Sequence, residues 1–469
     1  MSGDEPAGLA DDPDAGANGG AAPALSEVLQ VAAAAWSAVH AGRSLDTALE
    51  TALQAVPGAA SARLAGAARD LAAATVRRAA QIEFLLAQLA HRPPAPAVAA
   101  LLCVALAQLM ARSYAEFTLV DQAVRAARAA PATAAAAGLV NAVLRGFLRQ
   151  RAVLEPQACA EPARRFNVPQ WWLRRVEAEY GARAPALLAA QLEEPPLVLR
   201  VNVRRTGVAA MLGQMHAQGL AASQVGPSAI WLHRALPVER IPGFASGLVS
   251  VQDAGAQLAG PLLELADGMR VLDVCAAPGG KTAQLLELAD CRVDAVEFDP
   301  RRAQRIESNL QRLGLAGAAV RVIVADALVP AGYWDGKPYD RILLDAPCTA
   351  SGVVRRHPDV VLLRRESDVA KLATQQAKML QTLWPLLAPA GRLLYVVCSV
   401  FAEEGRRQVT SFLRRQPGAR RVPIRADDPA GLQLLPSTTA AAAVAAEQPD
   451  ATAYPVLHDG FFYALLEKT

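Results

Sequence analysis

The sequence predicts an α/β fold whose main part is a doubly wound, mostly parallel sheet, preceded by a small α+β module and an all-α region. Two patterns in the sequence predict the sheet and the helical region. From about residue 246 onward, short apolar runs alternate with helical stretches, which is typical of strand–helix–strand units. Between about residues 25 and 155, apolar residues instead recur with the spacing of helices. We therefore expect segments at residues 1–24, 25–155, 156–245 and 246–469.

The two N-terminal segments differ sharply in composition. Residues 1–24 are mainly Gly, Ala, Pro and Asp, which predicts a disordered acidic tail. In the helical region, the apolar residues of Leu139–Leu148 predict one buried helix face, and Val98–Met110 predicts a helix buried on most sides. Arg145, Arg149 and Arg151 lie off that face, where they could contact RNA or plain solvent. The sequence does not decide between the two.

The third segment, residues 156–245, mixes helix and strand. A helix is predicted to begin around Pro169, because proline is favoured in the first turn. The alternation in Leu197–Arg204 predicts a strand, with Arg200 and Arg204 on one face. Together with Arg205, these arginines are candidate contacts to RNA phosphates. It is equally consistent with the sequence that each of them is simply exposed to solvent at the edge of the module.

The fourth segment carries five apolar runs that predict parallel strands, followed by a closing strand over Asp459–Leu466. The five runs begin at Arg270, Arg292, Val320, Arg341 and Arg392. Residues 437–453 are rich in alanine and are predicted to form a surface loop.

The first of these strands runs into a glycine-rich turn, Cys275–Lys281. Glycine lets backbone N–H groups approach a ligand closely. The turn is not a Walker loop, because Cys275 stands where that loop needs glycine, and the G-x-G-x-x-G fingerprint is also absent. The remaining interpretation is a turn that binds a nucleoside without a polyphosphate.

Carboxylates follow the next two strands. Glu297 could accept hydrogen bonds from both ribose hydroxyls, and Asp326 is placed to meet an adenine edge. Because the carboxyl ends of parallel strands share one edge of a sheet, the turn and the two acids together predict a nucleoside site.

Two cysteines follow two further strands at the same edge, Cys348 shortly after Asp345 and Cys398 near the end of its strand. A lone buried cysteine is usually an apolar filler. Two of them beside an acid and a nucleoside site instead indicate covalent chemistry. His357 could serve as a general base, or equally as a structural or RNA-contacting residue.

Composition narrows the class of protein. The six cysteines are spread along 469 residues without a C-x-x-C pair, so neither a disulfide scaffold nor a metal site is expected. The apolar run Ala97–Ala107 is shorter than the roughly 18 residues that span a membrane, and no secretory signal opens the chain. We therefore expect a cytoplasmic, monomeric protein without a membrane partner. The net charge of +3 is compatible with nucleic acid but not diagnostic of it.

With these motifs, the chain resembles the RNA (cytosine-C5)-methyltransferases that use S-adenosylmethionine, and among them the bacterial small-subunit ribosomal RNA methyltransferase B group (Sun or Fmu type). The matching stretches are Asp273–Thr282, Leu344–Asp359, Cys398–Val400 and Asp459–Ala464, with Pro242–Phe244 and Val249–Gln257 upstream. Residues 25–155 resemble a NusB-like RNA-binding domain, notably in Gly138–Arg145. The resemblance implies a Rossmann-like methyltransferase domain over residues 246–469 and an RNA-binding module over 156–245.

The resemblance also implies the chemistry, a methyl transfer from S-adenosylmethionine to C5 of a cytosine in 16S ribosomal RNA. Cys398 would be the nucleophile that adds to C6, and Cys348 would assist release, whereas DNA cytosine methyltransferases use the Pro-Cys thiol as nucleophile. Asp345 would contact N3 and the amino group of the base. The residues implied for the cofactor pocket are Cys275, Ala276, Ala277, Pro278, Gly279, Gly280, Lys281, Glu297, Asp326 and Asp345.

Three positions depart from the family pattern. Val397 stands where the family has Thr, Gly405 where it has Asn, and Glu297 where Asp is commoner. The first two departures, with the NusB-like helices, support an alternative in which the chain is an RNA-binding or assembly factor with a relic active site. Another alternative keeps the enzyme and changes its substrate to transfer RNA or 23S ribosomal RNA.

Overall fold

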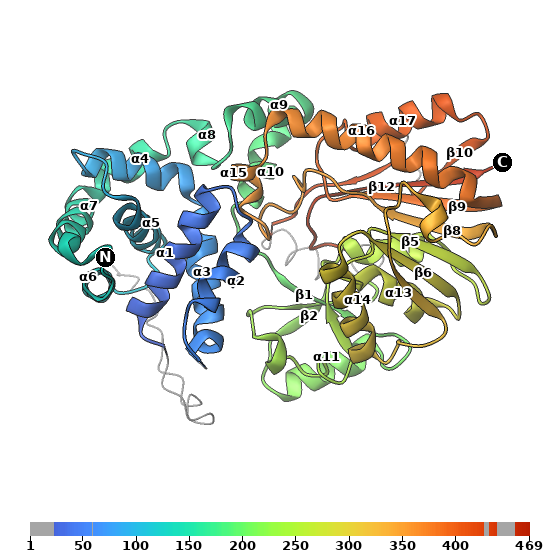
Figure 1. The fold of residues 1–469 in the computed structure, drawn as a ribbon, viewed down its shortest axis with the longest axis horizontal. Helices are drawn as coiled ribbons and strands as arrows, with labels where there is room; N and C mark the ends of the chain where they lie inside the picture. The colour runs from blue at the N-terminus through green and yellow to red at the C-terminus, as the bar shows by residue number, and fades with distance from the viewer. Residues whose placement is uncertain (1–22, 59, 426–430, 439–454) are drawn as a thin grey trace, which may run out of the picture. The chain divides into compact units, whose positions relative to one another are not determined.

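The computed structural model describes residues 23–58, 60–425, 431–438 and 455–469, and these divide into two compact units (Figure 1). Among the described residues, one unit holds 23–41, 45–75 and 85–152, and the other holds 42–44, 76–84 and those from 153 onward. Nearly all of the predicted acidic tail and of the predicted loop at 437–453 lies outside the described residues. None of the described helices combines the length and the apolar character that crossing a membrane requires.

The first unit is helical, as predicted. Helix α5 is buried along almost its whole length, which confirms the expectation for Val98–Met110, and α1 packs against α2, α5 and α6. On α7 the buried face contains Val140, Val143, Leu144 and Phe147, while Leu139 is exposed. The helices up to residue 158 are α1 (Leu25–His40), α2 (Leu45–Gln54), α3 (Ala60–Val76), α4 (Ala79–Leu89), α5 (Pro96–Ala111), α6 (Glu116–Ala129) and α7 (Ala137–Ala158). Most of α4 and the end of α7 belong to the second unit.

Arg151, one of the three arginines expected on the solvated side of α7, instead forms an ion pair and a hydrogen bond within the protein. The Arg151 guanidinium pairs with Glu116 and donates to the Leu109 carbonyl at 2.8 Å, and its side chain is largely buried. Arg145 and Arg149 are exposed, as expected.

The small module builds an antiparallel four-stranded sheet in the order β2-β3-β1-β4, with α11 (Val208–Ala217) packed on it through Met211 and Met215. Its strands are β1 (Leu197–Val201), β2 (Ala222–Gln224), β3 (Ala229–Leu232) and β4 (Val249–Val251). Strand β4 lies past residue 245, the limit expected from the sequence, and the domain limits stay a prediction. Three helices precede the sheet: α8 (Pro162–Arg165), α9 (Gln170–Tyr180) and α10 (Ala184–Ala190).

The predicted strand over Leu197–Arg204 is shorter than expected. It ends at Val201 because Asn202 begins a turn, in which its side-chain oxygen accepts from the Arg204 N–H at 3.2 Å and its carbonyl accepts from the Arg205 N–H at 3.0 Å. Arg200 and Arg204 therefore do not share a strand face.

The large sheet is doubly wound and mostly parallel, as predicted. Its strands run in the order β10-β12-β9-β8-β5-β6-β7, with β11 paired to β12. The neighbours from β9 to β7 are all parallel, and β12 is antiparallel to β9. The strands are β5 (Arg270–Val274), β6 (Arg292–Glu297), β7 (Val320–Val324), β8 (Tyr339–Asp345), β9 (Leu387–Val397), β10 (Ala419–Val422), β11 (Leu432–Leu434) and β12 (Phe461–Lys468).

Helices cover both faces of this sheet (Figure 1). Helices α13 (Gly280–Leu288) and α14 (Pro300–Leu313), with the short α12 (Ala259–Leu262), pack into one apolar core. Helices α16 (Glu366–Leu383) and α17 (Arg406–Arg415) pack into the other, and α15 (Val360–Leu363) precedes α16. The strand order reverses at β5, with β6 on one side and β8 on the other. In such sheets a crevice forms at the carboxyl ends of the strands where the order reverses, so the site is expected there.

Candidate active site

A cavity of about 640 Å³ lies at the carboxyl ends of the parallel strands. It collects side chains that follow each of the five parallel strands, as the sequence predicted for this edge of the sheet. The lining includes Cys275 and Ala277 after β5, Glu297 from β6, Asp326 after β7, Asp345 and Cys348 from and after β8, and Cys398 after β9.

The glycine-rich turn after β5 is tight. Gly279 has a φ of +92°, and a Cβ there would lie 3.0 Å from Ile306, so a larger residue would be strained. Cys275 itself adopts a φ of +61°. Only Cys275 and Ala277 of this turn line the cavity. The other predicted turn residues, Ala276, Pro278, Gly279 and Gly280, shape the turn and the start of α13.

The two predicted nucleoside acids occupy different environments. Glu297 is buried, and its carboxylate accepts from the backbone N–H groups of Ala277 at 3.3 Å and Asp299 at 3.1 Å. Asp326 is exposed at the cavity wall and accepts from the Leu328 N–H at 2.9 Å. Glu297 is therefore tied to the turn, while Asp326 is open to a ligand.

A third acid, Asp273 on β5, lies beneath the turn and was not among the predicted site residues. One of its oxygens accepts from the Thr282 hydroxyl at 2.6 Å, and the other is buried with no hydrogen-bond partner among the residues that the structure describes. Burial raises the pKa of Asp273 to about 7. Its place in the quoted stretch Asp273–Thr282 was the signal that could have identified it.

The two predicted catalytic thiols are in contact, with the Sγ atoms of Cys348 and Cys398 3.3 Å apart. The hydrogen bond to Cys398, together with burial, raises the pKa of the Cys348 thiol well above its ordinary value. Either sulfur atom can be the donor in this contact, and the raised pKa favours the protonated form of Cys348. Burial, reinforced by the charges of Asp345 and Glu297, raises the pKa of Cys275 to about 12. Two of the three cysteines around the cavity thus keep their protons.

Lys281 and Asp345 form an ion pair, with 2.6 Å between the Lys281 Nζ and a carboxylate oxygen. Burial alone would lower the pKa of Lys281, but the carboxylate of Asp345 outweighs it and raises the pKa, with a smaller contribution from Cys398. The Asp345 side chain keeps 29% of its surface exposed. Its carboxylate can therefore still contact a bound base.

The loops that carry the cysteines are fixed by neighbouring backbone. Gly352 donates its N–H to the Cys398 carbonyl at 2.9 Å and accepts from the Gly460 N–H at 2.8 Å. Asp459 accepts hydrogen bonds from both Arg355 and Arg356 in a buried cluster. The distinctive stretches around these residues thus hold the thiol loops in place.

His357, one candidate general base, is exposed and does not line the cavity. A role as general base in this cavity is therefore not supported. Within the described part of the chain, no group of three or more His, Cys, Asp or Glu side chains could hold a metal ion.

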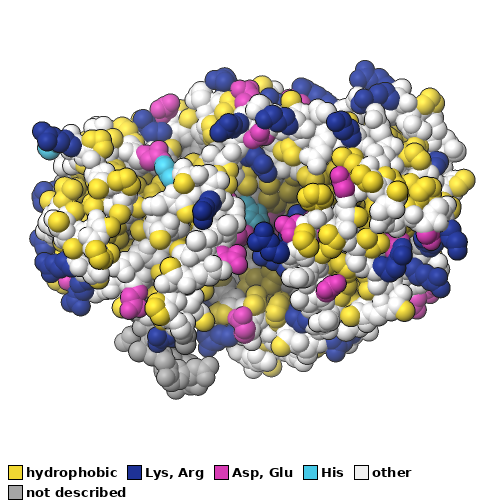
Figure 2. Space-filling model, viewed as in Figure 1, with side chains coloured by type: hydrophobic (Ala, Val, Ile, Leu, Met, Phe, Trp, Pro, Cys, Tyr) yellow, Lys and Arg dark blue, Asp and Glu magenta, His cyan; other side chains and the backbone are white. Residues whose placement is uncertain are grey.

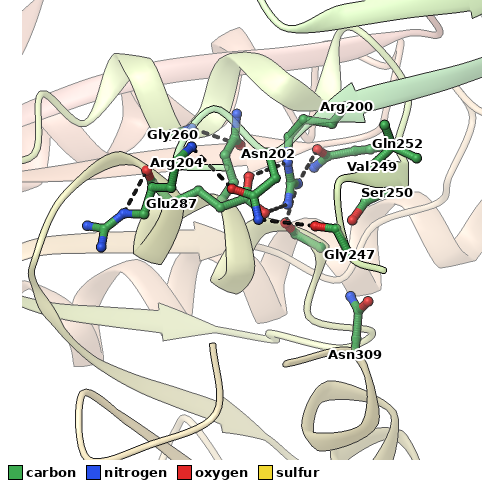
Figure 3. Close-up of polar contacts among 12 residues, drawn as sticks. Arg200, Asn202, Arg204, Gly247, Val249, Ser250, Gln252, Gly260, Glu287 and Asn309 are labelled. Carbon is green, nitrogen blue, oxygen red and sulfur yellow. Dashed lines mark hydrogen bonds and ion pairs between the residues drawn. The ribbon is translucent and has the colours of Figure 1, made fainter. Parts of the chain in front are cut away.

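The interpretation of Arg200 as a phosphate contact is wrong. Its side chain is 1% exposed and forms two hydrogen bonds with the carboxylate of Glu287 on α13, at 2.8 and 3.0 Å. It also donates to the Gln252 side chain and, at 2.6 Å, to the carbonyl of Gly280. Figure 3 shows Arg200 reaching from β1 toward Glu287 and Gln252. The small module is therefore joined to α13, the helix that follows the glycine-rich turn.

Neighbouring contacts strengthen the same junction. Arg204 donates to the Glu287 carbonyl at 3.0 Å and pairs with Asp290 at 2.7 Å, so it too is engaged within the protein. Arg312 of α14 donates to the Val249 carbonyl at 3.0 Å and to the Ser250 hydroxyl at 3.1 Å.

Basic side chains form no single large cluster on the face of the molecule that Figure 2 draws. On the face drawn in Figure 2, Lys and Arg side chains are spread singly or in small groups. Charge alone therefore identifies no RNA-binding surface on that face.

Three family models match consecutive parts of the chain. Residues 22–149 match the NusB family, 168–239 match a ferredoxin-like domain of the RsmF/B-like methyltransferases, and 261–467 match the 16S rRNA methyltransferase RsmB/F family. The solved structure of PH0851 superposes with a TM-score of 0.74 at 23% identity, covering 94% of this chain and 99% of that one, which shows the shared fold.

Curated relatives extend the match over most of the chain. Ribosomal RNA small subunit methyltransferase B of Pseudomonas putida is 38% identical over 449 residues, which cover 93% of this chain and 97% of the relative. The protein of the same name from Vibrio cholerae is 40% identical over 336 residues, 71% of this chain and 72% of the relative. The chain therefore belongs to the ribosomal RNA small subunit methyltransferase B family.

Proposed function

We propose that this methyltransferase moves a methyl group from S-adenosylmethionine to C5 of a cytosine in 16S ribosomal RNA, through a temporary bond between Cys398 and C6. The observation that carries the proposal is the 3.3 Å contact between the sulfur atoms of Cys348 and Cys398 in a cavity of nucleoside size. The names of the relatives support small-subunit ribosomal RNA as the substrate.

The residues around the cavity fit S-adenosylmethionine. Four carboxylates and one cation line the wall: Glu297, Asp299, Asp326 and Asp345 against Arg302. This excess of acids suits a positively charged ligand and opposes a polyphosphate. Glu297 would accept hydrogen bonds from the ribose hydroxyls, and Asp326 would accept from the adenine amine. Phe298 and Leu328 add apolar surface for the base. When bound, S-adenosylmethionine supplies an electrophilic methyl group on a sulfonium.

The protein must first provide a nucleophile, because C5 of cytosine is weakly reactive by itself. An ordinary thiol with a pKa of about 8.5 is only a few per cent ionised at neutral pH. Burial and the contact with Cys398 favour the protonated form of Cys348, which supports Cys398 as the attacking sulfur that the family resemblance implies. When Cys398 Sγ bonds to C6, the electron pair of the C5–C6 double bond moves to C5, which then takes the methyl group.

Asp345 would act before methyl transfer, in binding the cytosine, and Cys348 would act after it, in releasing the product. The Asp345 carboxylate, held by Lys281, would accept from the cytosine amino group and orient the ring near N3. After transfer, the hydrogen on C5 leaves as a proton to water, and the electron pair of that C–H bond restores the C5–C6 double bond. The pair of the C6–Sγ bond leaves with Cys398 as a thiolate. Cys348 lies beside the departing sulfur and would assist this release.

Single-cysteine variants test the assignment. Cys398→Ala should abolish transfer of a labelled methyl group from S-adenosylmethionine to 16S ribosomal RNA, because the attacking sulfur is gone. Cys348→Ala should accumulate a protein–RNA adduct that survives denaturing electrophoresis, because release is impaired. Cys159→Ala is the matched control, since Cys159 is exposed and lies outside the cavity.

Three outcomes would contradict the proposal. Undiminished transfer by Cys398→Ala would reject this nucleophile, and an adduct formed by Cys398→Ala rather than Cys348→Ala would reverse the two roles. No heat on titration with S-adenosylmethionine would favour the relic interpretation. Bisulfite sequencing of 16S, 23S and transfer RNA from a strain lacking the gene would show which RNA loses a methylated cytosine, and an unchanged 16S RNA would reject that substrate.

A further inference from the structure

A buried carboxylate outside the cavity joins the two thiol loops. Glu404 follows β9 and is fully buried. Thr349, the residue directly after Cys348, donates to Glu404 through its backbone N–H at 2.9 Å and its hydroxyl at 2.6 Å. Ser399, directly after Cys398, donates its hydroxyl to the same carboxylate at 2.6 Å. One side chain is thus bonded to the residue that follows each cysteine.

Further polar groups complete the network around these three residues. Gln376 of α16 donates to the Glu404 carboxylate at 3.1 Å, and the Ser351 hydroxyl lies 2.9 Å from that of Ser399. Tyr395 of β9 donates to the backbone carbonyl of Glu404 at 2.6 Å. The carboxylate therefore accepts four hydrogen bonds and receives no ion pair among the contacts described here.

Removing the Glu404 carboxylate from water costs free energy, which indicates that the carboxylate is needed at this position. Burial raises the pKa of Glu404, although hydrogen bonds from Ser399 and Thr349 lower it in part. An apolar side chain of similar volume would avoid the desolvation of a carboxylate but could not hold the hydroxyls of both loops. Glu404 does not line the cavity, so it cannot contact a bound substrate there.

We propose that Glu404 is a positioning residue that holds the sulfur atoms of Cys348 and Cys398 within contact distance, by bonding the residue after each of them. The inference rests on the proposed function for its link to methyl transfer. Its geometric part, the spacing of the two thiols, stands without it.

Two variants of Glu404 distinguish the effect of its side-chain shape from the effect of its hydrogen-bond acceptors. Glu404→Ala removes all four acceptor contacts, so the loops should separate and kcat should fall roughly a hundredfold, the effect of a displacement of about 1 Å at reacting groups. The KM for S-adenosylmethionine should stay unchanged. Glu404→Gln keeps the shape and one acceptor oxygen, and the Thr349 and Ser399 hydroxyls can turn to accept from its amide, so its loss should be smaller. Glu403→Ala is the control, because Glu403 bonds Arg175 and Arg407 instead.

The spacing of the thiols is measured without methyl transfer. Diamide, which takes up the two hydrogens as a disulfide forms, is added to the full chain, and the Cys348–Cys398 disulfide is quantified by mass spectrometry. It should form more slowly in Glu404→Ala than in wild type or Glu403→Ala.

A merely structural role would lower the melting temperature yet leave the kcat of the folded fraction and the disulfide rate unchanged, which would overturn the inference. If Glu404→Ala does not fold, equal disulfide rates and equal kcat in Glu404→Gln and wild type would overturn it as well. Slower disulfide formation with normal methylation by Cys398→Ala would instead reject the proposed function and leave the spacing role standing.

Discussion

The junction between Arg200 and Glu287 offers the sharpest test of the fold. Replacing Arg200 by Met removes the guanidinium and leaves the Glu287 carboxylate without its partner in a site where both side chains are almost fully buried, at 1% and 2% exposure. Water cannot reach the carboxylate to compensate, so its desolvation is no longer offset.

The magnitude follows from this burial. Removing one partner of a buried ion pair costs about 3–5 kcal/mol, whereas exposed pairs contribute about 0–1 kcal/mol. Arg200 also donates to Gln252 and to the Gly280 carbonyl, and these contacts are lost too. We therefore expect Arg200→Met to lower the free energy of unfolding by about 3–5 kcal/mol. The double variant Arg200→Met with Glu287→Met should recover most of that loss, because no buried charge remains.

Urea unfolding followed by tryptophan fluorescence measures Arg200→Met, Glu287→Met and the double variant. Arg69 and Asp46 provide the control, since their atoms are as close, at 2.6 Å against 2.8 Å for Arg200 and Glu287, but their side chains are 57% and 58% exposed. Arg69→Met should therefore cost no more than about 1 kcal/mol. If Arg200→Met costs as little as Arg69→Met, or if the effects at Arg200 and Glu287 simply add, the reasoning from burial is refuted.

Three further predictions concern the site. Because burial keeps Asp273 protonated up to a pKa of about 7, against 3.8 in the unfolded chain, wild type should lose stability relative to Asp273→Asn as the pH rises through that window. The loss should be about 1.4 kcal/mol per pH unit in urea unfolding without cofactor, and parallel curves would contradict it. Gly352→Ala would place a Cβ 2.1 Å from the Gly460 carbonyl oxygen, so the loop bonded to Cys398 must shift and the methyl-transfer assay should show a large loss. Gly138→Ala meets nothing within 4 Å and should leave activity intact, and equal activity of the two variants would refute the clash. Iodoacetamide at pH 8 should label Cys398 before Cys275, whose thiol stays protonated with a pKa of about 12, and mass spectrometry showing the reverse order would refute this.

Local sequence patterns predicted the elements of the fold that depend mainly on neighbouring residues in the chain. The runs at Arg270–Val274 and Arg292–Glu297 became β5 and β6, because short, largely apolar runs separated by helical stretches are typical of buried parallel strands. The convergence of Asp345, Cys348 and Cys398 also followed, because parallel strands bring their carboxyl ends to one edge.

Partners that come from distant segments could not be predicted. Alternation placed Arg200 on one face of its strand, but nothing in Leu197–Arg204 indicates that Glu287, 87 residues later, lies opposite. Glu404 likewise looks like one of two adjacent surface acids in the sequence, and only the fold shows that Thr349 and Ser399 surround it. Buried polar pairs depend on which surfaces meet, and that information is spread over the whole chain.

Two of the three departures from the family pattern, Val397 and Gly405, meet at one aromatic ring, and this argues against a relic site. Val397 pairs with Phe462 in the register of β9 and β12, and both side chains lie in the same buried apolar core. A Cβ at Gly405 would lie 3.0 Å from the ring of Phe462, so the asparagine usual in the family would need that ring to move. A hydroxyl at 397 would enter the same core, where an unpaired polar group is costly. The two substitutions therefore suit the packing around Phe462, and neither removes Cys348, Cys398 or Asp345 from the cavity.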